Sequence, residues 1–135
     1  MNIAISTGES RKSTTWKPEE ISWTEFCQRF NEPEVTQETV DEWQQMTRDE
    51  RANVKDVGGF VGGVVAGGRR SRNSITERQL VSLDVDYFTG TAEELMQDWD
   101  MYVGYTALIH TTHSHRPDHP RYRMLIPLSR PVTAD

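Results

Sequence analysis

Alternation of apolar and polar residues marks four candidate strands along the chain. The segments NIAIS (2–6) and QLVSLDVD (79–86) alternate in the way that is typical of strands with one buried face. Two further segments, 105–112 (YTALIHTT) and 121–128 (RYRMLIPL), are joined by a loop that contains two prolines. Residues 105–128 are therefore predicted to form a hairpin.

Helices are predicted where a Ser or Thr begins a capping pattern before an apolar run. The sequence SWTE at 22–25 predicts a helix to about Phe30, TQET predicts a second one from Thr36 to Met46, and TRDE a third from Thr47. A fourth is predicted from TAEE to about Trp99. Strands and helices in this order predict an α+β fold in which helices pack on an antiparallel-rich sheet.

Six glycines interrupt an apolar run at residues 58–70, GGFVGGVVAGGRR. Glycines within a strand mark a bulge or the close approach of another backbone or a ligand. We expect those at 58, 59, 62 and 63 to let the strand around Phe60 pass close to the strand that contains Leu83. At 135 residues the chain is expected to be one domain, with an N-terminal strand and helical part at 1–57 and a sheet-rich part at 58–135.

The net charge of −6 is unevenly distributed. Residues 17–50 carry ten carboxylates against three basic residues, 51–80 carry six basic residues against two acidic ones, and 81–100 carry six carboxylates and no basic residue. Residues 101–130 are basic again. A fold that brings the basic segments around the acidic strand would place arginines for phosphates beside carboxylates for cations, as in enzymes that handle nucleotides. A merely patchy surface is the alternative.

The remaining composition excludes several classes of protein. A single cysteine, Cys27, excludes an internal disulfide and a multi-cysteine zinc site. No run approaches the ~18 apolar residues of a membrane span, and the N-terminus lacks the apolar core of a signal peptide. We therefore expect a cytoplasmic protein.

Asp84 and Asp86 lie two positions apart in the predicted strand at 79–86, so both carboxylates leave the same face, about 6–7 Å apart at Cα. Val81, Leu83 and Val85 face the other way, which favours a central strand. Mg²⁺ or Mn²⁺ is the natural neutraliser of such a pair, and two such ions assist phosphoryl transfer. The alternative is an exposed strand with incidental acidic residues.

All four histidines lie within ten residues, at 110, 113, 115 and 119. On an extended segment His113 and His115 would share a face and donate hydrogen bonds to phosphate oxygens. Ordinary loop residues are the alternative, and His110 and His119 are expected to be structural.

Basic residues form the third set of candidates. Arg69 and Arg70 follow two glycines, with Arg72 close behind, and Arg121 and Arg123 share a face of the returning strand. Guanidinium groups bind phosphates bidentately. Salt bridges from Arg121 and Arg123 to Asp84 or Asp86 are an equally good interpretation.

The stretch KDVGGFVGGVVAGGRR, the strand LVSLDVD and the hairpin THSHRPDHPRYRMLIPLSRPV, after the opening TGESRKSTTW, resemble in this order the N-terminal part of a known family. It comprises primase-polymerases of the archaeo-eukaryotic primase superfamily that phages and mobile elements fuse to a virulence-associated-E-like helicase. The resemblance implies an RRM-like catalytic core in which Asp84 and Asp86 bind catalytic Mg²⁺ or Mn²⁺. Thr111 and His113 match a motif that contacts the phosphates of the incoming nucleotide, with His115 as the second choice.

The resemblance implies a template-dependent DNA primase and polymerase in mobile-element replication. Nucleoside triphosphates and a single-stranded DNA template would be its partners, with a helicase domain in the full-length protein. Arg69, Arg70, Arg121 and Arg123 would assist nucleotide binding. The family's third metal-binding aspartate has no match here, so we expect an incomplete catalytic core in this chain.

Two alternatives belong to other classes of function. A phage-encoded binding protein or inhibitor could retain the fold and present the acidic helices at 17–50 to a protein partner. A metal-dependent nuclease is less favoured, because no lysine or histidine that could activate water accompanies the two aspartates on their strand.

Overall fold

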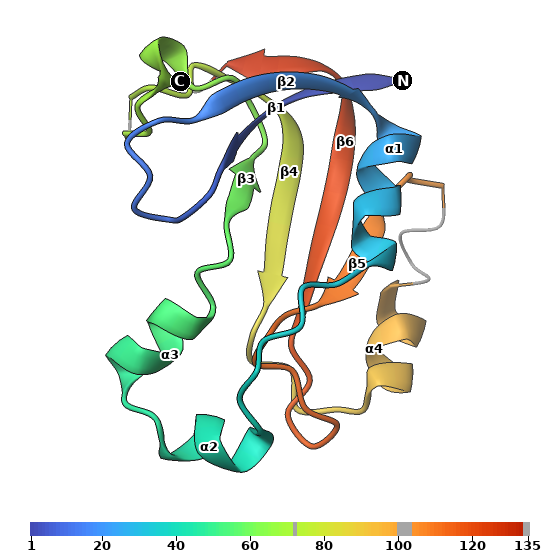
Figure 1. The fold of residues 1–135 in the computed structure, drawn as a ribbon. Coiled ribbons are helices and arrows are strands. Elements are labelled where there is room, and N and C mark those ends of the chain that lie inside the picture. Colours follow the sequence, from blue (N-terminus) through green and yellow to red (C-terminus); the bar gives the residue numbers. More distant parts are fainter. Residues whose placement is uncertain (72, 100–103, 134–135) are drawn as a thin grey trace.

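The computed structural model describes residues 1–71, 73–99 and 104–133 and has an α+β fold (Figure 1). The strands are β1 (Asn2–Gly8), β2 (Lys17–Ser22), β3 (Gly59–Val61), β4 (Glu77–Val85), β5 (Leu108–Thr111) and β6 (Tyr122–Thr133). The α-helices are α1 (Trp23–Gln28), α2 (Val40–Gln45), α3 (Arg48–Val54) and α4 (Ala92–Trp99). Two 3₁₀ turns, η1 (Arg29–Asn31) and η2 (Ala66–Gly68), complete the elements.

The strands form two three-stranded antiparallel sheets, in the orders β2-β1-β3 and β4-β6-β5. The predicted hairpin is confirmed, because β5 and β6 pair from Leu108 with Leu125 to Thr111 with Tyr122. The expectation that the acidic strand is central is wrong. In the second sheet β6 takes the centre and β4 lies at the edge, and Leu83 on β4 is 47% exposed.

The capping patterns determine where the N-terminal helices begin. Reciprocal capping boxes join Ser22 to Glu25 at α1 and Thr47 to Glu50 at α3, as expected. The second helix begins at Val40 rather than at Thr36, because its capping box is formed by Thr39 and Glu42. The residues before Thr39 form the connection from η1 to α2.

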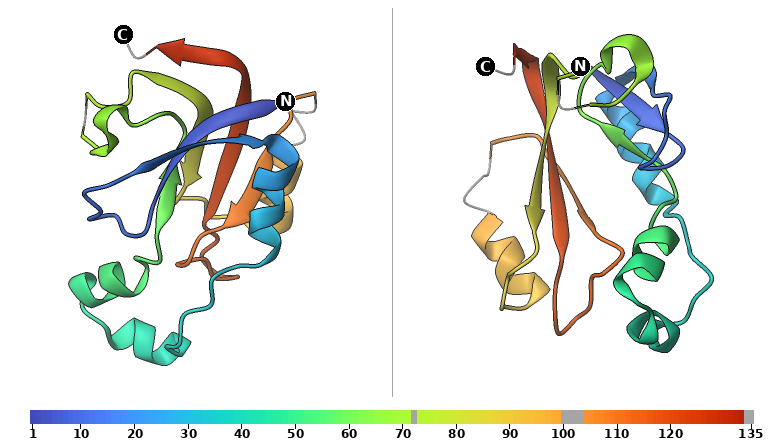
Figure 2. Two further views of the ribbon diagram at one scale, coloured as in Figure 1. Left: turned by 45° about the horizontal axis from the view of Figure 1, so that its top comes forward. Right: turned by 90° about the vertical axis from the view of Figure 1, so that its left-hand side faces the viewer.

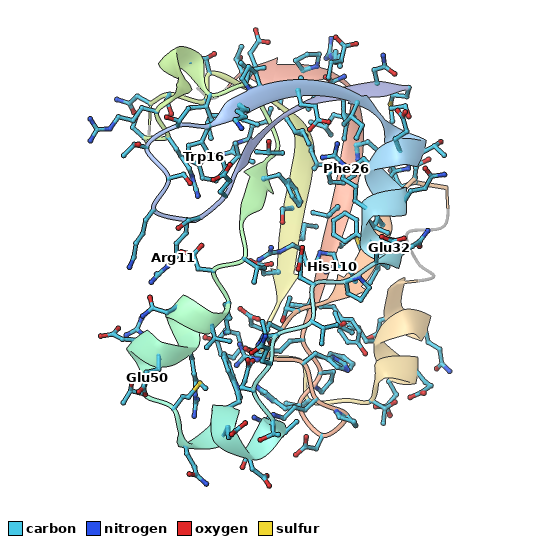
Figure 3. The ribbon with its side chains drawn as sticks, viewed as in Figure 1. Arg11, Trp16, Phe26, Glu32, Glu50 and His110 are labelled. Carbon is cyan, nitrogen blue, oxygen red and sulfur yellow. The ribbon has the colours of Figure 1, made fainter. Side chains whose placement is uncertain are left out.

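The main core lies between the two sheets. It is made of Ile3, Ile5, Ile21, Phe26, Leu80 and Leu125. Helix α1 places Phe26 against this core, where the side chain is 1% exposed (Figure 3). Helix α4 lies on the opposite face of the second sheet from β1 and β3, as the right-hand view of Figure 2 shows.

Two glycines allow β3 and the turn after it to approach β4 closely. A Cβ atom at Gly62 would lie 2.8 Å from the Cβ atom of Leu80 and would collide with the Leu80 carbonyl oxygen. A Cβ atom at Gly63 would collide with the carbonyl of Glu77. The expected close approach is therefore confirmed, with Leu80 and Glu77 in the place of Leu83. Gly58 and Gly59 depart from this expectation, because a Cβ atom at Gly58 would lie 3.0 Å from the Gly8 carbonyl oxygen of β1 and one at Gly59 would meet nothing within 4 Å.

Candidate functional site

The two aspartates at the end of β4 are held by arginines from β6. Arg123 lies opposite Asp84 in the register of the sheet, and its Nε donates to Asp84 Oδ1 at 2.6 Å. Arg121 Nη1 donates to Asp86 Oδ1 at 3.3 Å. The guanidinium groups thus offset the repulsion between the two carboxylates. No basic residue within segment 81–100 is present to do so. The sequence allowed either phosphate binding or these salt bridges for Arg121 and Arg123, and the structure contains the salt bridges.

The acidic pair is a possible ligand set for a hard cation. Mg²⁺ usually binds one or two protein carboxylates and completes its coordination with waters and substrate phosphates. Asp84 and Asp86 fit that mode, since their side chains are 50% and 41% exposed. Across residues 1–71, 73–99 and 104–133, no group of three or more His, Cys, Asp or Glu side chains is arranged to hold a metal. A cation here would therefore depend on ligand oxygens for its remaining coordination.

His113 and His115 do not share a face, so that expectation is wrong. The backbone turns at this point, with the His115 N–H donating to the Thr112 carbonyl at 2.9 Å. His113 Nε2 lies 3.0 Å from both Glu38 Oε1 and Thr36 Oγ1, and its ring is 4.5 Å from the Trp43 ring. His113 therefore joins the β5–β6 loop to the segment before α2.

Hydrogen bonding lowers the pKa of Glu38, chiefly through the hydroxyl of Thr36, which donates to it at 2.6 Å, and also through His113. Because an ionised carboxylate only accepts hydrogen bonds, Nε2 of His113 is the donor in this contact. This hydrogen bond occupies the imidazole that the resemblance assigns to nucleotide phosphates.

The other histidines have separate roles in the structure. His115 Nδ1 accepts from the backbone N–H of Arg121 at 3.2 Å, which fixes the loop against the start of β6. His110 packs on Phe30 with ring centroids 4.8 Å apart, and burial lowers its pKa (Figure 3). His119 accepts from Arg121 Nη2 at 3.3 Å.

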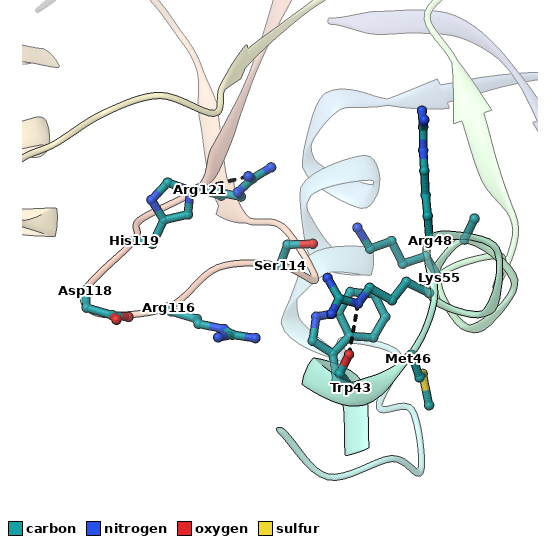
Figure 4. A pocket seen from close by; sticks show the side chains of 11 residues that line it. Trp43, Met46, Arg48, Lys55, Ser114, Arg116, Asp118, His119 and Arg121 are labelled. Carbon is teal, nitrogen blue, oxygen red and sulfur yellow. Dashed lines mark hydrogen bonds between the residues drawn. The ribbon is translucent and has the colours of Figure 1, made fainter. Parts of the chain in front are cut away.

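A groove of about 830 Å³ opens between helices α2–α3 and the β5–β6 loop (Figure 4). Five basic side chains and a single carboxylate line it, together with a tryptophan, a histidine, a methionine, an alanine and a serine. The lining residues are Trp43, Met46, Arg48, Arg51, Ala52, Lys55, Ser114, Arg116, Asp118, His119 and Arg121. This concentration of cations makes the groove suited to an anionic ligand.

Trp43 organises one wall of the groove. It is 7% exposed, and Lys55 Nζ and the Arg51 guanidinium lie 5.0 and 5.5 Å from its ring centroid. Arg51 is fixed further because its Nε donates to the Trp43 carbonyl at 2.9 Å. Burial is the main cause that lowers the pKa of Lys55, and the guanidinium groups of Arg121 and Arg51 add to it.

Arg121 connects the groove with the acidic pair, since it lines the groove and contacts Asp86. Its Nε atom is buried and has no acceptor within the described part of the chain. The sequence did not single out Trp43, Arg51, Lys55 or Arg116 for the site. The excess of basic residues at 51–80 was the available signal, but nothing in it distinguished Arg51 and Lys55 from Arg69 and Arg70.

Arg69 and Arg70 do not join this site. They follow η2, before β4 begins, whereas Asp84 and Asp86 lie at the other end of that strand (Figure 1). Arg72 lies outside the described residues. Arg121 and Arg123 therefore lie beside the acidic pair, whereas Arg69 and Arg70 lie at the other end of β4.

Most carboxylates of segment 17–50 have local partners. Glu25, Glu42 and Glu50 close capping boxes at the three N-terminal helices. Glu19 pairs with Arg29, and Glu20 accepts from the side chain of Asn2 at 3.0 Å. These contacts give the five residues a structural role within the fold.

The fold and the site define a small α+β domain in which paired carboxylates adjoin a cation-lined groove. The family comparison is specific about its relationship: the chain matches the VapE N-terminal domain over residues 1–135. The chain belongs to this family, which fits a virulence-associated-E-like protein of a phage or mobile element. Comparisons with curated proteins and with solved structures found no match. Among the described residues, no helix has the length and apolar character needed to cross a membrane.

Proposed function

We propose that this domain binds a nucleoside triphosphate as part of a metal-dependent nucleotidyltransferase, a template-dependent primase and polymerase that acts in mobile-element DNA replication. The observation that carries the proposal is the position of the groove. Five basic residues line the groove, and one of them, Arg121, also pairs with Asp86 of the acidic pair. Cations for phosphates and carboxylates for a metal ion thus adjoin each other.

The groove residues would bind and orient the triphosphate. Arg51 is already held by Trp43, and its charge adds to that of Lys55 beside the same ring. The guanidinium group of Arg116 reaches the groove from the opposite wall, the β5–β6 loop (Figure 4). Guanidinium groups match the geometry of phosphate oxygens, so both walls would contact the same anion.

The acidic pair would hold Mg²⁺ or Mn²⁺ through Asp84 and Asp86. Such an ion stabilises the negative charge that develops on a phosphoryl group during its transfer. Arg121 and Arg123 keep the two carboxylates in place before the ligand arrives. The unsatisfied Nε of Arg121 supports a further role, because a phosphate oxygen could provide the acceptor that this atom lacks.

His113 would act at the edge of the groove. Its imidazole is held by Glu38 in the structure, so a phosphate contact requires exchange of one anionic partner for another. His115 fixes the loop through its contact with the Arg121 backbone. We therefore assign His113 to the ligand and His115 to the support of Arg121.

Titration of dATP into the protein in the presence of Mn²⁺, followed by calorimetry, tests the proposal. Lys55→Gln should weaken binding by about tenfold, because a charge next to the phosphates is worth on the order of 1.4 kcal/mol. Arg29→Gln removes the same charge from a residue that pairs with Glu19 outside the groove and serves as the control. Equal binding by wild type and Lys55→Gln would contradict the proposal.

A further inference from the structure

A second, smaller core lies away from the groove. It consists of Trp16, Val61, Val65 and Ile75, and Trp16 is 3% exposed. Trp16 ends the loop between β1 and β2, and Ile75 precedes β4. This core therefore anchors two loops that are far apart in the sequence.

Hydrogen bonds fix the two loops to each other and to the first sheet. The Trp16 N–H donates to the Gly68 carbonyl at 2.6 Å, and the Val65 N–H donates to the buried Ser6 hydroxyl at 2.9 Å. Ser71 N–H donates to the side chain of Ser74 at 2.7 Å. The surface formed by residues 12–17 and 67–71, the loop platform, is thus organised before any ligand binds.

The basic residues of the loop platform differ from those near Asp84 and Asp86 in having few acidic partners. Within the described ranges, Lys12, Arg69 and Arg70 form no ion pair, and only Lys17 does, with Glu9 at 3.9 Å. The guanidinium of Arg70 lies 5.1 Å from the Trp16 ring centroid, which restrains it while its charge stays exposed. Gly67 adds an open backbone, since nothing lies within 4 Å of its Cβ position.

We infer that the loop platform binds the phosphodiester backbone of a single-stranded nucleic acid, the template strand of the proposed reaction. The inference rests on the proposed function for the identity of this strand. Exposed cations with few acidic partners, on a preformed surface, match a repeating anion better than a compact metal-bound one. Trp16 is too buried to stack on a base, so the contact is with phosphates and carries no sequence preference.

The position of the loop platform fits this assignment. It lies near the start of β4, whereas Asp84 and Asp86 lie at its end (Figures 1 and 3). The nine residues of β4 span about 26 Å at roughly 3.3 Å per residue. A template strand held at the platform could therefore extend along the molecule towards the groove that takes the triphosphate.

Fluorescence anisotropy of a labelled oligothymidylate of about 12 nucleotides tests the inference, without nucleotide or metal. The double substitution Arg69→Gln/Arg70→Gln should weaken binding about tenfold and reduce the slope of log K against log salt by about 1.4, the loss of two phosphate contacts. Arg70→Lys keeps the charge but loses the planar contact with Trp16, so its affinity should lie between those of wild type and of the double variant.

Arg29→Gln is the control, because Arg29 carries the same charge in a pair with Glu19 outside the platform. An oligouridylate should bind as well as the oligothymidylate, since the contacted phosphodiester groups carry the same charge in RNA and DNA. Equal losses in Arg29→Gln and Arg70→Gln, or no saturable binding by wild type, would overturn the inference. If dATP still binds in a Lys55-dependent way, that failure leaves the proposed function standing.

Discussion

Two buried tryptophans organise basic residues at opposite ends of β4, and the two regions differ in what balances the charge. Trp43 lies under Lys55 and Arg51 at the groove, where Asp118 lines the same hollow and Asp86 contacts Arg121. Trp16 lies under Arg70 at the loop platform, where the neighbouring cations have almost no acidic partners among the described residues.

The difference shows that the number of basic residues does not by itself identify the ligand. A region that mixes carboxylates with cations suits a ligand that brings both a metal ion and phosphates. A region of exposed cations alone suits an extended polyanion. The distinction depends on β6, which carries the arginines that meet the acidic end of β4.

The largest effect is expected from removing the aromatic ring at the loop platform. Trp16→Ala should lower the free energy of unfolding by about 3–5 kcal/mol, because it empties the centre of the second core. Trp43→Ala should cost less, since the Trp43 ring contacts the polar side chains Arg51, Lys55 and His113. Chemical denaturation of both variants measures this. A larger loss in Trp43→Ala would reverse the structural roles given to the two rings.

The next effect concerns the seam that joins β3 to β4. Gly62→Val should lower the free energy of unfolding by about 2–3 kcal/mol, since the new side chain meets the backbone of Leu80. Gly59→Ala is the control and should change stability by no more than about 0.5 kcal/mol. An unchanged melting temperature in Gly62→Val would show that the sheets are not packed as described.

The acidic pair should affect cation binding more than folding. Asp84→Asn and Asp86→Asn should each weaken Mn²⁺ binding by about tenfold, while the free energy of unfolding changes by less than about 1 kcal/mol, because both ion pairs are partly exposed to solvent. Isothermal titration with Mn²⁺ and chemical denaturation give the two readings. Unchanged Mn²⁺ binding in both variants would contradict the assignment of Asp84 and Asp86 as metal ligands.

The smallest effect is a dependence on acid at the loop between β1 and β2. A hydrogen bond from the Ser10 hydroxyl, followed by one from the Arg11 N–H, lowers the pKa of Asp56. Since the folded-state pKa lies below the unfolded one, this stabilisation is complete above the unfolded pKa and is lost as pH falls through the folded value.

Asp56→Asn should therefore lower the melting temperature at neutral pH and reduce the further loss that wild type shows as the pH falls below the ordinary pKa of an aspartate. Glu9→Gln serves as the control, because Glu9 is exposed on the same loop. Parallel melting curves of wild type and Asp56→Asn against pH would refute this role for Asp56.

The sequence predicted best what depends on neighbouring residues. Each capping box, at Ser22 and at Thr47, involves only four consecutive residues, and the sequence predicted both of the helices that begin there. The start of α2 was misplaced because Thr36 also precedes the spaced apolar residues Val40 and Trp43, although its hydroxyl donates to Glu38 instead. Local capping patterns therefore identified the helices more reliably than they fixed the first residue.

The arrangement of distant segments was harder to predict. Alternation predicted the strand β4 but not its edge position, which depends on β6 pairing with two partners. The groove joins residues 43–55 to residues 114–121, and no local pattern relates those segments. His113 was recognised as a candidate, but its partner Glu38 lies 75 residues earlier in the chain.

The most direct test of the two-region account is a crossed binding experiment. Wild type, Lys55→Gln and Arg70→Gln are each titrated with dATP in Mn²⁺ and, separately, with the oligothymidylate. The account predicts that Lys55→Gln weakens dATP binding alone and that Arg70→Gln weakens oligonucleotide binding alone. If each substitution weakens both ligands to the same extent, the two ends of β4 form a single undifferentiated anion-binding surface, and the account is contradicted.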